Sequence, residues 1–216
     1  MADEIGEFLK HFFENEKQTK FEKMKRLNKF VKEGQILFTG SSLMEHFPIN
    51  ELAQGHSSKL IYNRGVGGST SKEFIEHLDA LLLDLKPSKV FINIGTNDLS
   101  DPNFTNDQLI ENYRFILSRL DEVSKDAKVY FIAFYPMNEN KLVRKGAFGN
   151  RTNELVSSAN LALTTFLKDY KNVKILDFNS KLRDEEGRLK EEYTMDGVHL
   201  YPDVYKIIFD GLKDLL

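Results

Sequence analysis

Short apolar runs that alternate with longer segments of helical period constrain this chain more than any other feature. The runs of strand length are Gln35 to Thr39, Lys59 to Asn63, Lys89 to Ile94, Lys128 to Phe134 and Val173 to Asp177. Apolar residues recur at spacings of three and four in Ser71 to Leu85, Asp107 to Lys125 and Arg151 to Tyr170. This alternation predicts an α/β fold, a doubly wound sandwich in which helices cover a five-stranded parallel sheet.

Composition narrows the class of protein further. A chain of 216 residues that is 41% hydrophobic can bury one core, so we expect a single domain over residues 34–216 with an N-terminal helix over residues 1–33. The net charge of -3 argues against nucleic acid as a partner, and the lack of cysteine excludes disulfides and Cys-based zinc sites. No apolar run is long enough to span a bilayer, and the acidic start of the chain is unlike a signal peptide. We therefore expect a cytoplasmic protein without metal or cofactor.

The expected N-terminal helix carries an apolar stripe whose partner is open. The stripe is interrupted by a polar stretch from Glu14 to Lys20 and consists of Ile5, Phe8, Leu9, Phe12, Phe13, Phe21, Met24, Leu27, Phe30 and Val31. It can pack on its own domain, bind a partner or form a homodimer, because an amphipathic stripe does not identify the surface that it covers.

Gly-containing polar turns follow three consecutive predicted strands. They are Gly40-Ser41-Ser42-Leu43, the segment from Asn63 to Thr70, and Gly95-Thr96-Asn97-Asp98. Each turn by itself is typical of ordinary chain reversal. Because parallel strands end at the same edge of a sheet, the three turns together predict a ligand site there.

A fourth segment, Asp196-Gly197-Val198-His199, indicates nucleophilic chemistry. An Asp three residues before a His can fold its carboxylate back onto the imidazole N–H, which is the orienting half of a nucleophilic triad. Alone, such a pair is more often a surface turn. Ser42 is the candidate nucleophile, and the order Ser, Asp, His is one of several in which this geometry recurs.

In order and spacing, these four segments resemble the sequence blocks of the SGNH hydrolases, also called GDSL esterases and lipases. The resemblance covers residues 35 to 205, and Asn63-Arg64-Gly65-Val66-Gly67-Gly68 is similar to the bacterial branch that resembles platelet-activating-factor acetylhydrolase. It implies a flavodoxin-like three-layer α/β/α sandwich. It also implies site roles: Ser42 as nucleophile, His199 as base, Asp196 as its orienting carboxylate, and Gly68 and Asn97 in the oxyanion hole.

The activity implied is that of a serine esterase that hydrolyses a small-molecule ester through an acyl-enzyme intermediate. Acetyl is the expected acyl group, because the chain has no long apolar lid segment suited to a fatty chain. A carbohydrate O-acetylesterase or an acyl thioesterase with the same site is the alternative, and a catalytically idle binding module on this fold is another. The irregular segment from Tyr135 to Asn150 is expected to line or cover the cleft, where Arg144 and Lys145 would favour an anionic or polyhydroxylated substrate or would be solvated loop charges.

Two local ambiguities accompany these roles. Ser41 stands where most members of the family have Asp, and its hydroxyl is expected to hold the turn through side-chain to backbone bonds. Alignment of Gly40 with the family glycine favours Ser42 over Ser41 as nucleophile. His46 could compete as base, but a histidine so close to Ser42 would point along the following helix, so we expect it at the rim.

Overall fold

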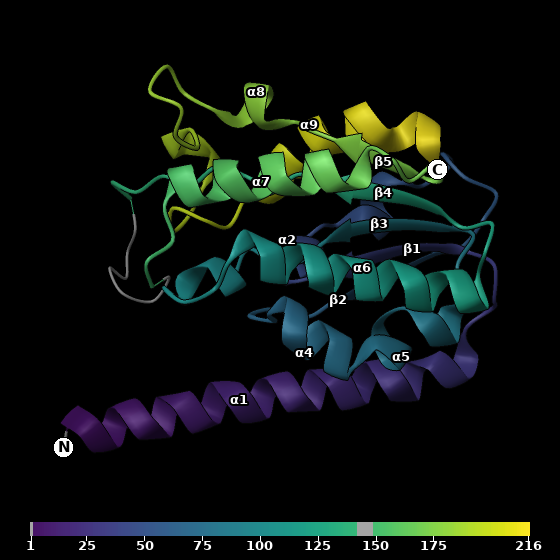
Figure 1. The fold of residues 1–216 in the computed structure, drawn as a ribbon, viewed down its shortest axis with the longest axis horizontal. Helices are drawn as coiled ribbons and strands as arrows, with labels where there is room; N and C mark the ends of the chain where they lie inside the picture. Colours follow the sequence, from purple (N-terminus) through teal and green to yellow (C-terminus); the bar gives the residue numbers. More distant parts are fainter. Residues whose placement is uncertain (1, 142–148) are drawn as a thin grey trace.

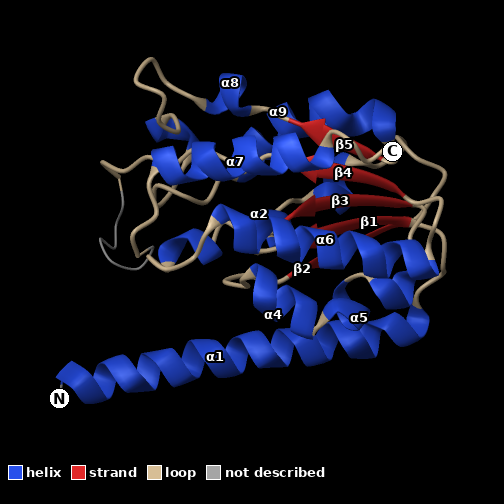
Figure 2. Ribbon diagram, viewed as in Figure 1, coloured by secondary structure: helices blue, strands red, loops and turns tan. Residues whose placement is uncertain are grey.

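Five parallel strands form the centre of the protein. The computed structural model describes residues 2–141 and 149–216, and its strands are β1 (Ile36–Gly40), β2 (Ile61–Gly65), β3 (Lys89–Asn93), β4 (Lys128–Ile132) and β5 (Val173–Leu176). Their order is β2-β1-β3-β4-β5 (Figure 2). Ile36 pairs with both Ile61 and Lys89. All five predicted strands are present, with ends that differ from the prediction by at most two residues.

Helices cover both faces of this sheet, which confirms the three-layer α/β/α sandwich. One face packs against α4 (Ser71–Glu76), α5 (Leu78–Leu81), α6 (Asn106–Val123) and α7 (Asn153–Leu167). The other face packs against α2 (Ser42–Glu45), α3 (Ile49–Leu52), α8 (Asn179–Leu182) and α9 (Pro202–Leu212). Short 3-10 helices occupy Asn28–Phe30, Leu83–Leu85, Asp98–Ser100, Glu191–Tyr193 and Lys213–Leu215.

The near-continuous apolar character of the strands follows from this double cover. Successive strand side chains point to opposite faces, so Leu37 joins one core cluster while Phe38 joins the other. Across the sheet, Phe38 stacks on Phe91 and Phe91 stacks on Tyr130, with ring centroids 4.5 and 4.6 Å apart. These contacts hold the middle strands in register and bring the carboxyl ends of β1 and β3 together.

The N-terminal helix, α1 (Ala2–Leu27), runs unbroken through the polar stretch that interrupts its stripe. Its second half packs on its own domain, because Phe21 is buried and stacks on the His77 ring at 3.9 Å. Its first half extends beyond the carboxyl ends of the strands (Figure 1). The apolar residues of that half remain exposed: Ile5, Phe8, Leu9, Phe12 and Phe13. A homodimer through this helix stays a prediction.

The prediction of a single helix over Ser71 to Leu85 is wrong, because the segment forms α4, α5 and a 3-10 turn. His77 leaves helical geometry between α4 and α5, where its ring packs on Phe21 of α1. At the end of α5, the hydroxyl of Thr39 donates to the Leu81 carbonyl at 3.0 Å. In a continuous helix that carbonyl would accept the N–H four residues later. Tertiary contacts therefore override the helical period.

No helix in residues 2–141 and 149–216 combines the length and the apolar character needed to cross a bilayer.

Candidate active site

The turn after β1 places Ser42 at the carboxyl edge of the sheet. Gly40 has φ +144, and a Cβ there would overlap the carbonyl oxygen of Asn93, so glycine is required. The Ser41 N–H donates to that same carbonyl at 3.1 Å, and the chain then enters α2 at Ser42. The Ser41 hydroxyl makes no capping bond to α2, so the expectation that it holds the turn is wrong, and backbone bonds hold it instead.

The turn from Asp196 to His199 folds as its spacing predicts. Asp196 Oδ1 accepts the backbone N–H groups of Val198 and His199 at 2.9 and 2.8 Å, while Oδ2 lies 2.6 Å from His199 Nδ1. Burial alone would raise the pKa of Asp196, but these bonds, led by the His199 side chain, outweigh burial and leave the pKa below its ordinary value. Asp196 is therefore an ionised acceptor that requires the proton of the imidazole on Nδ1.

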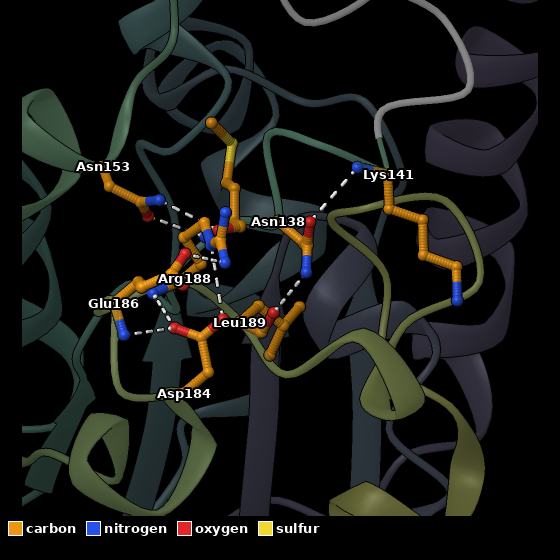
Figure 3. Close-up of polar contacts among 8 residues, drawn as sticks. Asn138, Lys141, Asn153, Asp184, Glu186, Arg188 and Leu189 are labelled. Atoms are coloured by element: carbon orange, nitrogen blue, oxygen red, sulfur yellow. Dashed lines mark hydrogen bonds and ion pairs between the residues drawn. The ribbon is translucent and has the colours of Figure 1, made fainter.

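The loop after β4 supports this turn. The Asn138 N–H donates to the Gly197 carbonyl at 2.8 Å. The Asn138 side chain is itself fixed, because its Nδ2 donates to the Leu189 carbonyl at 2.8 Å and its Oδ1 accepts the Lys141 N–H at 3.2 Å (Figure 3). Residues 135–141 of the predicted cleft segment therefore support the Asp-His turn, and neither they nor residues 149 and 150 are among the residues that line the cleft, whereas Arg144 and Lys145 lie outside the described residues.

Ser42 and His199 meet across the sheet edge. His199 Nε2 lies 2.9 Å from Ser42 Oγ. Because Nδ1 carries the proton that faces Asp196, Nε2 is left as the acceptor for the Ser42 hydroxyl. His46 lies at the rim of the cleft, as expected, with its ring 5.1 Å from that of His199. Partial burial, followed by the neighbouring His199, lowers the pKa of His46.

Ser42, Gly68, Asn97 and His199 all line one open cleft with a volume of about 640 Å³. Gly68 lies in the turn after β2 with φ +76, a conformation that favours glycine, and Asn97 follows β3. The structure thus brings together the five residues selected from the sequence, since Asp196 joins them through His199. Three separate strand ends and the C-terminal turn supply them.

The side-chain amide of Asn97 has a defined orientation. Its Oδ1 accepts from Arg151 Nη2 at 2.9 Å, and its Nδ2 donates to the Ser69 carbonyl at 2.8 Å. Because arginine has only donors, the atom that faces it must be the oxygen. Ser69 accepts one of the two N–H groups, so the amide retains a second N–H that can serve as a donor in the cleft.

Sequence reasoning missed the residues that position this site. Arg151, 6% exposed, opened a predicted helix without any sign of a role, and its partner Asn97 lies 54 positions earlier. Burial lowers the pKa of Arg151 to about 10, so it remains a cation at neutral pH. Glu45 was also missed: its Oε2 accepts the Gly67 N–H at 2.8 Å. Glu73 had a local signal, the capping box that it forms with Thr70 at the start of α4.

Within the described residues, no three His, Asp or Glu side chains are grouped so that they could hold a metal ion.

Asp98, another acid near the site, has a structural role, because its carboxylate accepts the Ser71 N–H and hydroxyl. It therefore ties the loop after β3 to the start of α4.

Comparison with known proteins agrees with this geometry. The pattern of the GDSL-like Lipase/Acylhydrolase family matches residues 41–207. A Streptococcus pneumoniae structure described as a candidate platelet activating factor is 30% identical, covers 100% of this chain and 99% of its own, and has a TM-score of 0.89. An acetyl xylan esterase structure is 16% identical, with 84% of this chain and 98% of that chain covered and a TM-score of 0.67, and shows the fold alone.

Among curated sequences, the GDSL esterase/lipase At2g38180 of Arabidopsis thaliana is 25% identical over an alignment of 201 residues that covers 84% of this chain. This chain spans 64% of the length of that plant protein and 42% of the length of a second curated relative.

Proposed function

Since this chain belongs to the GDSL-like lipase/acylhydrolase family, we propose that it is a serine esterase that hydrolyses short-chain esters through an acyl-enzyme intermediate. The observation that carries the proposal is the continuous chain of contacts from Ser42 Oγ to His199 Nε2, at 2.9 Å, and from His199 Nδ1 to Asp196 Oδ2, at 2.6 Å. Such a chain activates a hydroxyl that is otherwise a poor nucleophile at neutral pH.

In the first half of the reaction, Ser42 Oγ attacks the ester carbonyl carbon while His199 Nε2 takes the hydroxyl proton. The resulting tetrahedral intermediate carries negative charge on the former carbonyl oxygen. When the bond to the alcohol breaks, His199 returns its proton to the leaving alkoxide, and the acyl group remains on Ser42. Asp196 stabilises the imidazolium that exists between the two transfers and stays ionised throughout.

In the second half, water takes the place of the alcohol. His199 removes a proton from the water as its oxygen attacks the acyl-enzyme, and then returns that proton to Ser42 Oγ as the acid is released. In both halves, the backbone N–H groups of Ser42 and Gly68 and the amide of Asn97 would donate to the oxyanion. Donors that are already aimed at this point act without reorganisation, which is why they accelerate the reaction.

The lining of the cleft supports a short acyl group. Among its described lining residues only Phe13 and Val198 carry wholly apolar side chains, whereas Glu14, Glu16, Lys17, Lys20 and Glu45 are charged. A long alkyl chain would meet these carboxylate and ammonium groups along the cleft, and their desolvation would oppose its binding. Acetyl is therefore our proposed acyl group.

The same charged lining favours a second candidate, a carbohydrate O-acetylesterase. Carboxylates and ammonium groups can form hydrogen bonds with the hydroxyls of a sugar, whereas apolar side chains cannot. In this version Ser42, His199 and Asp196 keep their roles, and only the leaving alcohol differs.

The proposal is tested with purified protein on p-nitrophenyl acetate, butyrate and octanoate, an acetylated sugar and an acetyl thioester. We expect hydrolysis to be fastest for acetyl esters, and Ser42→Ala to abolish it without loss of the folded CD spectrum. Ser41→Ala is the matched control and should remain active. A fluorophosphonate should label wild-type Ser42, and a wild-type protein that neither hydrolyses esters nor forms this adduct would indicate a binding module instead.

A further inference from the structure

Two lysines of α1 reach across to the edge of the active site. Lys17 Nζ lies 2.5 Å from Glu73 Oε1, and Lys20 Nζ lies 3.1 Å from Glu45 Oε1. These side chains are shielded from solvent, with exposed fractions between 19% and 31%. Such partial burial reduces the screening of these ion pairs by salt.

The two carboxylates hold opposite ends of the turn from Gly67 to Thr70, which we call the oxyanion loop because it contains Gly68. At one end, Glu45 Oε2 accepts the Gly67 N–H at 2.8 Å. At the other end, Glu73 Oε2 accepts the Thr70 N–H at 2.9 Å and the Thr70 hydroxyl at 3.0 Å. Gly68 lies between these two points, so the direction of its N–H depends on both.

The charged forms of these side chains stabilise each other. Burial alone would lower the pKa of Lys20, but Glu45 and then Glu16 outweigh burial and leave the pKa raised. Burial alone would raise the pKa of Glu73, but its bonds to Lys17 and Thr70 leave the pKa lowered. Without Lys17 and Lys20, Glu73 and Glu45 could still accept hydrogen bonds from the loop, but no cation would fix the positions of the two carboxylates.

Helix α1 is held in place independently of these lysines. Phe21 anchors its second half in the core, and Asn28, just beyond its end, donates to the Ala80 carbonyl at 2.9 Å. The middle of the helix borders the cleft, where Phe13, Lys17 and Lys20 line it together with Ser42, and the first half extends beyond the carboxyl ends of the strands (Figure 1). A change at either lysine can therefore alter the oxyanion loop without detaching the helix.

We propose that α1 is a positioning element of the active site: Lys17 and Lys20 hold Glu73 and Glu45 so that these carboxylates fix the oxyanion loop in the geometry that aims the Gly68 N–H at the substrate. This inference rests on the proposed function, because the loop has this role only if Gly68 donates to a developing oxyanion. Neither lysine touches the reacting atoms, so both act through the loop.

The test uses Lys17→Met, Lys20→Met and the double variant, with Lys23→Met, an exposed lysine of the same helix, as matched control. With p-nitrophenyl acetate, we expect kcat of the double variant to fall about tenfold while KM stays within about twofold of wild type. The loss in kcat is smaller than the roughly 100- to 1,000-fold that removal of a whole oxyanion donor costs, because the Gly68 N–H is displaced rather than removed. Lys17→Arg and Lys20→Arg should restore most of kcat, and Lys23→Met should match wild type.

Hydrogen exchange of the peptide that contains residues 67–70 gives a readout besides activity, and should be faster in the double variant than in wild type or Lys23→Met. An active wild type with unchanged kcat and exchange in the double variant would overturn the inference but leave the esterase. If wild type has no esterase activity but exchange of residues 67–70 is still faster in the double variant, the proposed function and the kinetic role of α1 are overturned. Only the conclusion that α1 fixes the oxyanion loop then remains.

Discussion

Arg151 and Asn97 form a hydrogen bond of 2.9 Å that determines which way the Asn97 amide points. The same guanidinium Nη2 lies 3.2 Å from Ser100 Oγ, so it is held against the loop that follows β3. A buried cation behind an amide also polarises it toward donating its N–H groups. Arg151 is thus placed to strengthen the Asn97 N–H groups as donors.

We expect Arg151→Met to lower kcat by about tenfold or more with little change in KM, because the amide loses its orientation and a small misplacement of a catalytic donor costs up to about 100-fold. Arg151→Lys should be intermediate, since an ammonium can donate to Oδ1 but lacks the planar fork. Arg114→Met, at an exposed position on α6, is the control. Steady-state kinetics on an acetyl ester would contradict this role if Arg151→Met kept the wild-type kcat.

Asn97→Ala should remove one oxyanion donor and lower kcat by roughly 100- to 1,000-fold. The matched control is Asn103→Ala, an exposed asparagine six positions later in the same loop region. Both variants should bind fluorophosphonate at Ser42, with Asn97→Ala reacting more slowly because that adduct also places an oxygen in the oxyanion hole. Equal rates for the two variants would remove Asn97 from the site.

Asp196→Asn should lower kcat by about 10,000-fold, as expected when the residue facing Nδ1 no longer fixes the tautomer of the base. Because the pKa of Asp196 lies below its ordinary value of 3.8, its carboxylate is charged throughout the neutral range. The deficit should therefore persist from pH 6 to pH 8 in kcat measurements. Asp203→Asn, exposed at the start of α9, is the control, and an Asp196→Asn variant as active as this control would refute the triad.

Gly40→Ala should destabilise the protein by more than about 3 kcal/mol, because the new Cβ would strike the Asn93 carbonyl in addition to occupying an unfavourable backbone conformation. Gly34→Ala is the matched control. Gly34 also has a positive φ, +74, but no atom lies within 4 Å of the added Cβ. Its cost should be the conformational penalty alone, about 1–2 kcal/mol. Urea unfolding of both variants measures the difference, and similar midpoints would argue against the close approach at Gly40.

The stability that Glu73 contributes should depend on pH. Its pKa in the folded protein is lower than the ordinary value of 4.5, so folding favours the ionised form. This contribution is fully present above the unfolded pKa and is lost as the pH falls through the folded pKa. Urea unfolding should therefore show a gap between wild type and Glu73→Gln at pH 7 that shrinks at pH 3. Glu76→Gln, exposed on the same helix, controls for the substitution itself. A difference in unfolding free energy between wild type and Glu73→Gln that is the same at pH 7 and pH 3 would contradict the lowered pKa of Glu73 in the folded protein.

Much of the fold could be predicted because local patterns reflect it directly. The three inner strands, β1, β3 and β4, are apolar runs buried on both faces, as Leu37 and Phe38 illustrate, so their apolar content located them, whereas the edge strands β2 and β5 are only partly buried. The helix over Ser71 to Leu85 could not be predicted as three pieces. The groups that break it, Phe21 and Thr39, lie outside the segment and meet it only in the folded protein.

The sequence by itself determined the positions of the strands, the turns that end them and the chemical types of the candidate residues, because each of these depends on neighbours within a few positions. Only the tertiary structure decided that Ser42 and His199, 157 positions apart, meet at 2.9 Å, that Arg151 orients Asn97, and that α1 borders the cleft. These relationships arise from the parallel sheet, which gathers distant strand ends at one edge, and no local periodicity encodes which of them come into contact.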